Sequence, residues 1–302
     1  MKIANVEIGG RSCVALIVKD EAIDISAELG DALDDAPRFW AMGAEVHDLA
    51  ERCLRSRAPR IPLETVKLRP PILRPDKILG VGMNYRSFVN AAREIGMPMP
   101  ANRIWFLRPP SCIVGPRDDV WLPSGATDFD YECELAIVIG RRCRHLRASQ
   151  AATVIAGYTV ANDMTLRGQA TKSLVFAKAF DTHTPLGPWI VTADEIGDVQ
   201  SLGVKTWVNG ELRQDGNTSD MVVQCHQLVA EITEALTLNA GDIIMSGTPD
   251  GCGIFRKPPV GLANGDLVKL EIEGIGCMEN RVVHEPSVSP AAEPRDSTPT
   301  PQ

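Results

Sequence analysis

The amino-acid sequence predicts an α+β protein that is mostly β, and three observations lead to this fold class. From about Ile78 to Val283 the chain consists of short runs of Val, Ile and Thr separated by Gly, Pro, Asn and Asp, a pattern typical of strands joined by turns. Apolar spacing typical of helices is restricted to a few short stretches. Hydrophobic residues make up 44% of the 302 residues, enough for one substantial core. We therefore expect one main domain, residues 71–283, and a smaller N-terminal domain, residues 1–70.

The N-terminal domain is predicted to be a small α/β module. Alternating apolar and polar residues between Lys2 and Val18 indicate strands, with a hairpin at Gly9-Gly10. A helix is expected near Ala44 to Leu54. Prolines at positions 70, 71 and 75 then mark a connector. No pattern of catalytic residues is present in this module.

The main domain is expected to begin with a buried strand at Ile78–Gly82. Further along, Asn209-Gly210 predicts a hairpin because this pair suits the positive φ angles of a type I′ turn. After His284 the chain is rich in Pro, Ser, Thr and Ala, so residues 284–302 are predicted to form a disordered tail.

Charge and composition exclude several classes of function. A formal net charge of -8 and a pI near 5.2 argue against nucleic acid or an anionic membrane as the main partner. No run approaches the roughly 20 apolar residues of a membrane span, and the N-terminus lacks the apolar stretch of a signal peptide. The eight cysteines form no CxxC pair, which favours reduced, buried thiols over disulfides or a zinc site. We expect a cytoplasmic protein that acts on a small molecule.

The segment from Asp128 to Ile139 carries the most informative pattern. Alternate side chains of a strand share a face, so the carboxylates would point one way and the large apolar residues the other. The strand runs into a buried apolar stretch, where unpaired carboxylates are costly, so a cation is expected nearby. A solvated edge strand is the alternative. The carboxylates concerned are Asp128, Asp130, Glu132 and Glu134.

A further carboxylate, Asp163, follows the apolar run Val154–Ala161. The end of a buried strand is a suitable place for a metal ligand, although Asp also favours helix caps and turns. Oxygen ligands without a neighbouring His or Cys select a hard cation, Mg²⁺ or Mn²⁺ before Zn²⁺. Glu132, Glu134 and Asp163 are therefore the candidate metal ligands.

Several motifs in one order give this chain a resemblance to a known family. The segment 131–140, followed by 157–163, resembles the fumarylacetoacetate hydrolase family. The other motifs that carry the resemblance are Lys178-Ala179-Phe180-Asp181, Pro185-Leu186-Gly187-Pro188-Trp189, Asn209-Gly210-Glu211, Gly241-Asp242-Ile243 and Ser246-Gly247-Thr248-Pro249-Asp250-Gly251.

The resemblance implies a mixed β-roll or β-barrel core, a short lid helix and, usually, a homodimer. It implies that Glu132, Glu134 and Asp163 hold Mg²⁺ or Mn²⁺, with Ca²⁺ as a substitute in crystals. It also implies that Lys178 has a catalytic role, neutralising the carboxylates or steadying an enolate. The positions implied to contact a small oxo-acid or diketone substrate are Tyr85, Phe88, Arg167, Gln169 and Thr248. Gln169 is two residues after Arg167, whereas the family commonly spaces Arg and Gln three apart.

The lid departs from the hydrolytic members of the family. Those members carry a His and a Glu that activate water, and the matching positions here are Phe88 and Ala91. Either Glu94 or His183 replaces the missing base, or the reaction needs no hydrolytic water. A third explanation is that Phe88 packs against an apolar substrate, and a purely structural role in the core is the alternative to all three.

The leading hypothesis from the sequence is metal-dependent hydrolysis of a C–C bond in an acylpyruvate or β-diketone, in the catabolism of aromatic compounds or oxo acids. The cation would act as a Lewis acid for the enolate that leaves. The alternative, favoured by the altered lid, is an isomerase, decarboxylase or hydratase of a related 2-oxo acid. A metal-bearing oxo-acid-binding protein without turnover is the third hypothesis.

Overall fold

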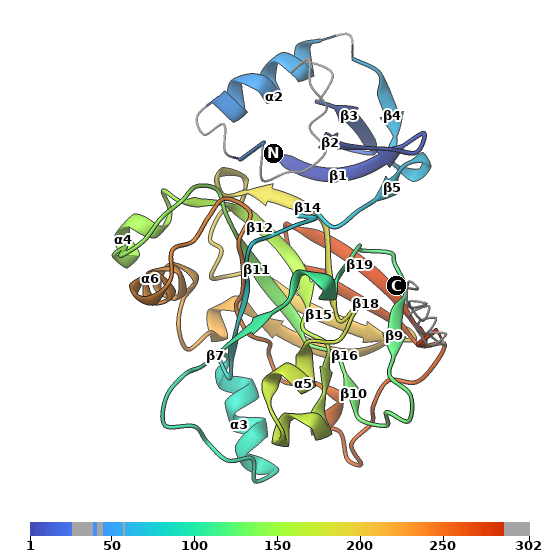
Figure 1. The fold of residues 1–302 in the computed structure, drawn as a ribbon, viewed down its shortest axis with the longest axis vertical. Helices are drawn as coiled ribbons and strands as arrows, with labels where there is room; N and C mark the ends of the chain where they lie inside the picture. Colours follow the sequence, from blue (N-terminus) through green and yellow to red (C-terminus); the bar gives the residue numbers. More distant parts are fainter. Residues whose placement is uncertain (26–38, 41–44, 57, 287–302) are drawn as a thin grey trace, which may run out of the picture.

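The computed structural model describes residues 1–25, 39–40, 45–56 and 58–286 (Figure 1). Most of the predicted tail, residues 287–302, lies outside the described residues. The mostly β fold class is confirmed, because the described strands form two large sheets and one small one, with few helices between them. The large sheet is an open array of strands and does not close into a barrel within the described part of the chain.

The large sheet has twelve strands among the described residues and spans both predicted domains. Strand β1 of the N-terminal module pairs with β14 of the main domain, with Ile3 opposite Ile190. The N-terminal module is therefore joined to the main domain by backbone hydrogen bonds. In order of pairing the strands are β4 (Arg60–Pro62), β3 (Glu21–Asp24), β2 (Arg11–Val18), β1 (Lys2–Ile8), β14 (Thr184–Thr192), β12 (Ile155–Asn162), β11 (Cys133–Ile139), β17 (Ile243–Met245), β6 (Ile78–Gly82) and β7 (Ile104–Arg108), with β5 (Lys67–Leu68) on β1 and β8 (Ile113–Val114) on β14.

A second sheet packs on one face of the large sheet. Its strands, in order of pairing, are β16 (Glu211–Asn217), β15 (Gly203–Val208), β18 (Leu267–Ile272), β19 (Gly276–His284) and β9 (Val120–Leu122). The predicted hairpin is confirmed, because Asn209 and Gly210 join β15 to β16 with φ angles of 52° and 81°. Leu135 and Ile137 of β11 share one apolar core with Val204 and Leu270 of this second sheet. The core therefore lies between the two sheets.

Few helices surround the sheets. Helix α2 (Glu45–Arg55) forms where the N-terminal module was expected to be helical, and α3 (Arg86–Glu94) forms at the predicted lid. The other α-helices among the described residues are α4 (Ala148–Ala151), α5 (Leu174–Lys178) and α6 (Cys225–Ala235). Figure 1 shows α3 and α5 toward the end of the molecule that lies opposite the N-terminal strands.

One strand prediction was wrong. The segment 128–139 does not form one strand, because the chain changes sheet between Asp130 and Cys133. Strand β10 (Phe129–Asp130) pairs with β13 (Thr165–Leu166) in a separate two-stranded sheet, whereas β11 enters the large sheet. Periodicity alone does not reveal such a break, since both short pieces alternate correctly. The four carboxylates therefore do not form a single row.

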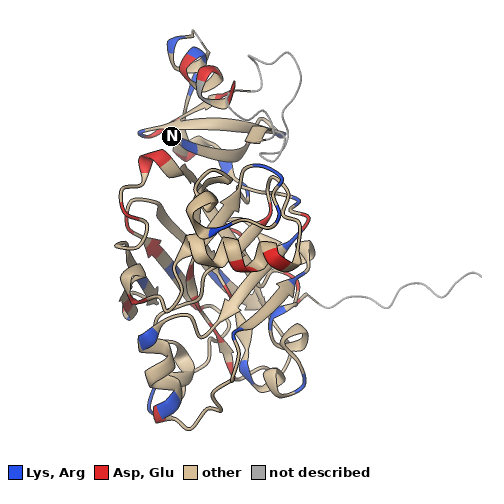
Figure 2. Cartoon of the chain, turned by 90° about the vertical axis from the view of Figure 1, so that its left-hand side faces the viewer, with Lys and Arg blue, Asp and Glu red and all other residues tan. Residues whose placement is uncertain are grey.

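The surface and the cysteines agree with the composition. All eight cysteines are free thiols, and only Cys277 is exposed. Figure 2 shows acidic and basic residues mixed, both in the N-terminal module and around the lower helices. Among the described residues, no helix is long and apolar enough to cross a bilayer.

Candidate metal centre and active site

Three carboxylates meet where β11 begins and β12 ends. Cys133 lies opposite Asn162 in the antiparallel pair β11–β12, which places Glu132 beside Asp163 across the two strands. The N–H of Asp163 donates to the carbonyl of Glu132 at 2.9 Å. Glu134 is the second residue of β11. Oxygen atoms of Glu132, Glu134 and Asp163 all lie within 4.8 Å of one another, and each side chain is at most 5% exposed.

Three cationic side chains surround this carboxylate cluster, of which Arg108 and Lys178 are buried and Arg167 is 14% exposed. Lys178, the last residue of α5, donates from Nζ to Glu132 Oε2 at 2.9 Å and also to Asp163 Oδ2. Arg108, at the end of β7, donates to Asp163 Oδ1 and to the carbonyl oxygen of Lys178. Arg167 forms an ion pair with Glu132 at 2.6 Å between Nη1 and Oε1. Arg108 and Lys178 therefore each bind a different oxygen of Asp163.

The three carboxylates differ in electrostatic environment. Burial by itself would raise the pKa of Glu132, but the charges of Lys178 and Arg167 lower that pKa to about 2. Burial and the neighbouring charges of Asp163 and Glu132 raise the pKa of Glu134 well above its ordinary value. Burial also raises the pKa of Asp163, although Lys178 and Arg108 oppose this. Glu134 is therefore the least compensated carboxylate of the cluster.

The donor set fits a hard divalent cation. Glu134 Oε2 accepts the N–H of Gly247 at 2.7 Å, and the ion pairs of the three cations reach Glu132, Asp163 and Asp130 but not Glu134. Three carboxylates within reach of one ion, without His or Cys, are the oxygen ligands that Mg²⁺ and Mn²⁺ prefer. The cluster is thus a candidate divalent metal centre, with Glu134 as the ligand that gains most from the ion.

Thr248 lies in the turn that closes over Glu134. Gly247, with φ at 92°, leaves no room for a side chain, because a Cβ there would lie 2.8 Å from Asn84 Cβ. The hydroxyl of Thr248 donates to the carbonyl of Cys133 at 2.8 Å and accepts from Gln214 Nε2 at 2.8 Å. In this conformation the Thr248 side chain is engaged by the protein, and its contact with substrate stays a prediction.

The lid helix presents packing residues to the core. Phe88 is 6% exposed and meets the ring of Phe255 edge-on, with centroids 4.9 Å apart. Tyr85, the N-cap residue of α3, is fully buried, and its hydroxyl has no hydrogen-bond partner among the described residues. Ala91 is half-buried. Glu94, one candidate base, is exposed at the last position of the helix.

His183, the other candidate base, packs against aromatic side chains. Its ring lies between Phe129 and Phe180, with centroids 4.5 and 5.0 Å away, and Nε2 lies 2.9 Å from the carbonyl of Trp121. Burial lowers the pKa of His183 to about 3, so the ring is neutral at physiological pH. Gln169 is half-buried in a short 3-10 helix, Arg167–Thr171. The structure therefore brings Lys178 and Arg167 to the carboxylates, but neither candidate base.

Sequence reasoning missed Arg108 and the role of Asp130. Arg108 is a cation at the end of an apolar strand, and this signal was available, but its partner Asp163 is 55 residues away in the chain. Asp130 was noted only as one of four carboxylates. Its Oδ2 accepts from Arg167 Nε at 2.9 Å, and its Oδ1 accepts the N–H of Gly253 at 2.7 Å.

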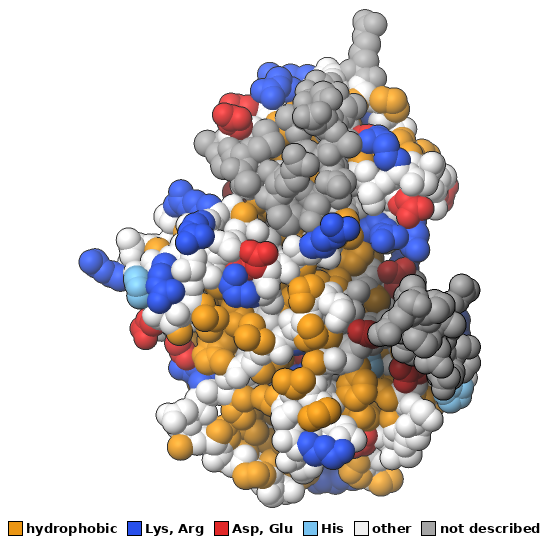
Figure 3. Space-filling model, in the orientation of Figure 1, with side chains coloured by type: hydrophobic (Ala, Val, Ile, Leu, Met, Phe, Trp, Pro, Cys, Tyr) orange, Lys and Arg blue, Asp and Glu red, His pale blue; other side chains and the backbone are white. Residues whose placement is uncertain are grey.

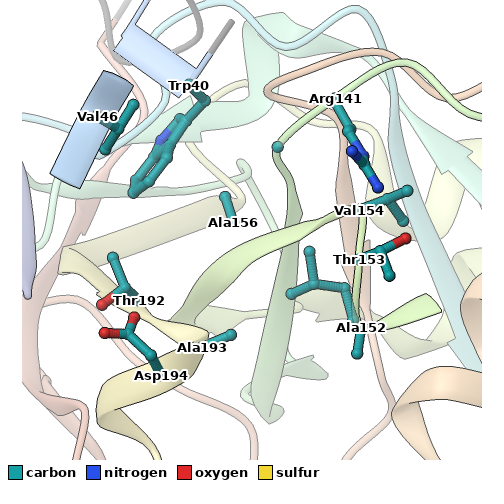
Figure 4. A pocket seen from close by; sticks show the side chains of 12 residues that line it. Trp40, Val46, Arg141, Ala152, Thr153, Val154, Ala156, Thr192, Ala193 and Asp194 are labelled. Carbon is teal, nitrogen blue, oxygen red and sulfur yellow. The ribbon is translucent and has the colours of Figure 1, made fainter. Parts of the chain in front are cut away.

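Of two cavities in the described part of the chain, the smaller one borders the candidate metal centre. A cavity of about 430 Å³ lies between Trp40 of the N-terminal module and the Gly140 and Val154 region of the main domain (Figure 4). None of the three carboxylates lines this cavity. A smaller one, of about 160 Å³, is bordered by Asp130 and Arg167 and so lies next to the metal centre.

The fold and the carboxylate cluster define a class of proteins, namely metal-binding enzymes with a mostly β core and a centre of three carboxylates. Comparison with known proteins gives the family. The family model described as fumarylacetoacetate (FAA) hydrolase C-terminal matches residues 77–283. This chain belongs to the fumarylacetoacetate hydrolase family.

Curated relatives include oxaloacetate tautomerases. The mitochondrial oxaloacetate tautomerase FAHD2A of Homo sapiens is 41% identical over 250 residues, which cover 82% of this chain and 79% of the relative. The mitochondrial oxaloacetate tautomerase of Xenopus laevis is 39% identical over 249 residues, covering 81% of this chain and 77% of the relative.

Solved structures of the same fold include a hydrolase and an isomerase. The maleylpyruvate hydrolase of Sphingobium sp. SYK-6, in complex with manganese(II) and pyruvate, has a TM-score of 0.80 and 34% identity, covering 94% of this chain and 99% of that one. The 5-carboxymethyl-2-hydroxymuconate delta-isomerase of Mycobacterium smegmatis has a TM-score of 0.74 and 32% identity, covering 95% and 100%. The fold therefore occurs with more than one reaction.

Proposed function

We propose that this chain is a metal-dependent isomerase that interconverts the keto and enol forms of oxaloacetate or a closely related 2-oxo dicarboxylic acid. The observation that carries the proposal is the lid. Phe88 occupies the position of the water-activating His and packs on Phe255, while Glu94 is exposed and His183 faces Trp121. Tautomerisation needs no hydrolytic water, so this lid suits it. The sequence identity with oxaloacetate tautomerases supports the same choice. Isomerisation, the alternative in the sequence analysis, therefore becomes our leading hypothesis in place of hydrolysis.

The residues around the metal centre would divide the work as follows. Glu132, Glu134 and Asp163 would hold Mg²⁺ or Mn²⁺, and the ion, when bound, supplies Lewis-acid polarisation of a 2-oxo group. Arg167 is placed to bind a substrate carboxylate, because its Nη2 is buried without a hydrogen-bond partner among the described residues.

Lys178 is the proposed proton-transfer group. The reaction moves one proton between C3 and the 2-oxo oxygen, and no carbon–carbon bond breaks. The Nζ atom of Lys178 is buried among Glu132, Asp163 and Thr165, with the hydroxyl of Thr165 at 2.9 Å. Burial opposes its charge, but the charges of Asp163 and Glu132 raise the pKa of Lys178 above its ordinary value. Lys178 is therefore protonated at neutral pH. In the proposed step Nζ gives this proton to C3 and takes up the proton of the enol hydroxyl, so the lysine ends the step protonated.

Hydrolysis of an acylpyruvate is the second candidate, and the similarity to maleylpyruvate hydrolase favours it. Under this alternative, Glu94 or a group supplied on lid movement would have to activate the water. The distinction is chemical, because hydrolysis gives two acids and tautomerisation leaves the mass unchanged.

The test is an ultraviolet assay with Mn²⁺ or Mg²⁺ that follows the enol absorption of freshly dissolved oxaloacetate, with products identified by mass spectrometry. Lys178→Met should abolish the metal-dependent acceleration, because the buried proton donor is removed. Lys172→Met is the matched control, since Lys172 is an exposed lysine of the neighbouring segment. Loss of the enol band without change of mass supports the proposal. Two acids from maleylpyruvate, with no acceleration of oxaloacetate tautomerisation, would replace it by hydrolysis.

The predicted homodimer is also a proposal. Leu107 of β7 and Val175 and Phe176 of α5 are 54%, 61% and 58% exposed. Figure 3 shows hydrophobic side chains gathered on the face where Figure 1 draws these two elements. An apolar surface of this kind supports association, and analytical ultracentrifugation of Phe176→Glu beside the unchanged protein tests it. The cytoplasmic location stays a prediction, and the human and Xenopus relatives are named as mitochondrial.

A further inference from the structure

The side chain of Asp130 accepts four hydrogen bonds. The carboxylate is 2% exposed. Its Oδ1 accepts the N–H groups of Tyr131 and Gly253, at 2.9 and 2.7 Å. Its Oδ2 accepts from Arg167 Nε at 2.9 Å and from the N–H of Ile254 at 3.1 Å. Four donors from three parts of the chain therefore converge on one buried carboxylate.

The backbone around Asp130 is shaped to admit this carboxylate. A Cβ at Gly253 would lie 2.9 Å from Asp130 Oδ1 and 2.1 Å from the carbonyl oxygen of Val260. Only glycine therefore brings the N–H of this turn so close to the carboxylate. The tight approach fixes the turn 253–255 relative to Asp130.

The same turn carries the residue on which the lid helix rests. Phe255 follows the two N–H groups that Asp130 accepts, and its ring meets Phe88 of α3 at 4.9 Å between centroids. A second contact joins this loop to the helix, because the N–H of Asp250 donates to Ser87 Oγ at 3.4 Å. The position of α3 therefore depends in part on the turn that Asp130 holds, and in part on Asp220, which accepts the N–H of Ser87 at 2.8 Å.

On its other side Asp130 holds Arg167, which pairs with the metal ligand Glu132. A continuous chain of contacts thus runs from Glu132 through Arg167 and Asp130 to Phe255 and Phe88. We propose that Asp130 is a positioning residue that couples the Arg167–Glu132 pair to the turn 253–255, against which the lid helix α3 packs. The inference rests on the proposed function only in treating α3 as the lid of the substrate site.

The coupling has a consequence for specificity. Because Phe88 packs against Phe255, the lid helix is held in place by aromatic packing. A substrate carboxylate that binds Arg167 would change the Arg167–Asp130 contact and, through the turn 253–255, the position of the lid helix. This coupling would favour substrates that carry a carboxylate near Arg167, as a 2-oxo dicarboxylic acid does.

Hydrogen exchange with mass spectrometry on the full chain, freed of metal by EDTA, tests the coupling. In Asp130→Asn we expect exchange of α3, of the turn 251–256 and of the segment 167–171 to accelerate about 10-fold or more, the factor for losing one hydrogen bond to a charged group. Phe255→Leu should accelerate α3 alone, and Phe255→Tyr, which keeps the ring, should restore the exchange of the unchanged protein. Asp266→Asn is the matched control, since Asp266 also accepts a backbone N–H, that of Ala263, but in an exposed turn.

The outcomes separate the possibilities. Unchanged exchange of α3 in a folded Asp130→Asn protein would overturn the coupling, even if the segment 167–171 exchanged faster. Should Asp130→Asn not fold, the pair Phe255→Leu and Phe255→Tyr decides, and equal exchange of α3 in both overturns it. The readout does not depend on turnover. The expected exchange pattern in a protein without tautomerase activity would support the coupling and refute the proposed function.

Discussion

The charge of Glu134 is the feature whose removal we predict in most detail. Glu134→Gln keeps a carbonyl oxygen for the N–H of Gly247, which lies 2.7 Å from Glu134 Oε2. It removes a negative charge that lies within 4.8 Å of Glu132 and Asp163. At an effective dielectric constant of about 20, each such repulsion amounts to roughly 3 kcal/mol, and attraction to Lys178 offsets about one of the two. We expect the metal-free variant to be about 1–3 kcal/mol more stable than the unchanged protein.

The sign of the pH dependence follows from the raised pKa of Glu134. The folded protein binds a proton at Glu134 more tightly than the unfolded chain does, so unfolding releases that proton above pH 4.5. The stability of the unchanged protein therefore falls relative to the variant as pH rises from 4.5 toward the folded-state pKa. The difference grows by about 1.4 kcal/mol for each pH unit in that window.

Urea unfolding followed by tryptophan fluorescence, at several pH values in EDTA, measures both effects. With Mn²⁺ the order should reverse, because an ion at 100 times its Kd adds about 2.7 kcal/mol to the unchanged protein and less to the variant. Glu279→Gln, at an exposed position of β19, is the control for loss of a remote charge. A metal-free Glu134→Gln protein that is less stable than the unchanged one would refute the charge argument. Equal stabilisation of both by Mn²⁺ would show that Glu134 is not a ligand.

Three further predictions concern stability. Burial lowers the pKa of His183 from 6.5 to about 3, so the free energy of unfolding falls as pH drops below 6.5. Between pH 6.5 and pH 4.5 this loss amounts to about 2.7 kcal/mol. His183→Asn should lack the loss when urea unfolding is compared at these two pH values. Gly157→Ala would place a Cβ 2.1 Å from the carbonyl oxygen of Val191, so we expect a loss of about 2 kcal/mol or more by urea unfolding. Gly197→Ala, where a Cβ meets nothing within 4 Å, should change stability by less than about 0.5 kcal/mol. Asn84→Ala removes side-chain hydrogen bonds of 2.8–2.9 Å to the backbone of Ser246 and Val223, and thermal unfolding should show a loss of about 2–4 kcal/mol; an unchanged melting temperature would contradict this.

Local patterns predicted much of the fold and the three carboxylates that meet at the candidate metal centre. The hairpin at Asn209-Gly210 depends on backbone angles that these two residues favour by themselves. Glu132, Glu134 and Asp163 were found because carboxylates next to buried strands need compensation, wherever the strands pair. These predictions required information from only a few neighbouring residues.

The rest depends on contacts between distant parts of the chain. Arg108 of β7 contacts Asp163 at the end of β12, although three strands lie between β7 and β12 in the order of pairing, and no local pattern reveals such a contact. Asp130 was placed on the wrong strand for the same reason, since the change of sheet is set by pairing with Thr165. His183 was a candidate base on the strength of its residue type. The sequence does not reveal that its ring packs against Phe129 and Phe180, where burial lowers its pKa to about 3, and its role as a base stays a prediction.

The pairing of β1 with β14 has a consequence for how the chain folds. Ile3 finds its partner, Ile190, only after most of the chain has been synthesised, and β6 likewise pairs with β17 across more than 160 residues. Contacts of such long sequence separation form slowly. By contrast, Glu132 and Asp163 come from neighbouring strands and can meet early. Gly247 follows β17, the last described strand of the large sheet along the chain, so the hydrogen bond that holds Glu134 also joins residues 113 positions apart.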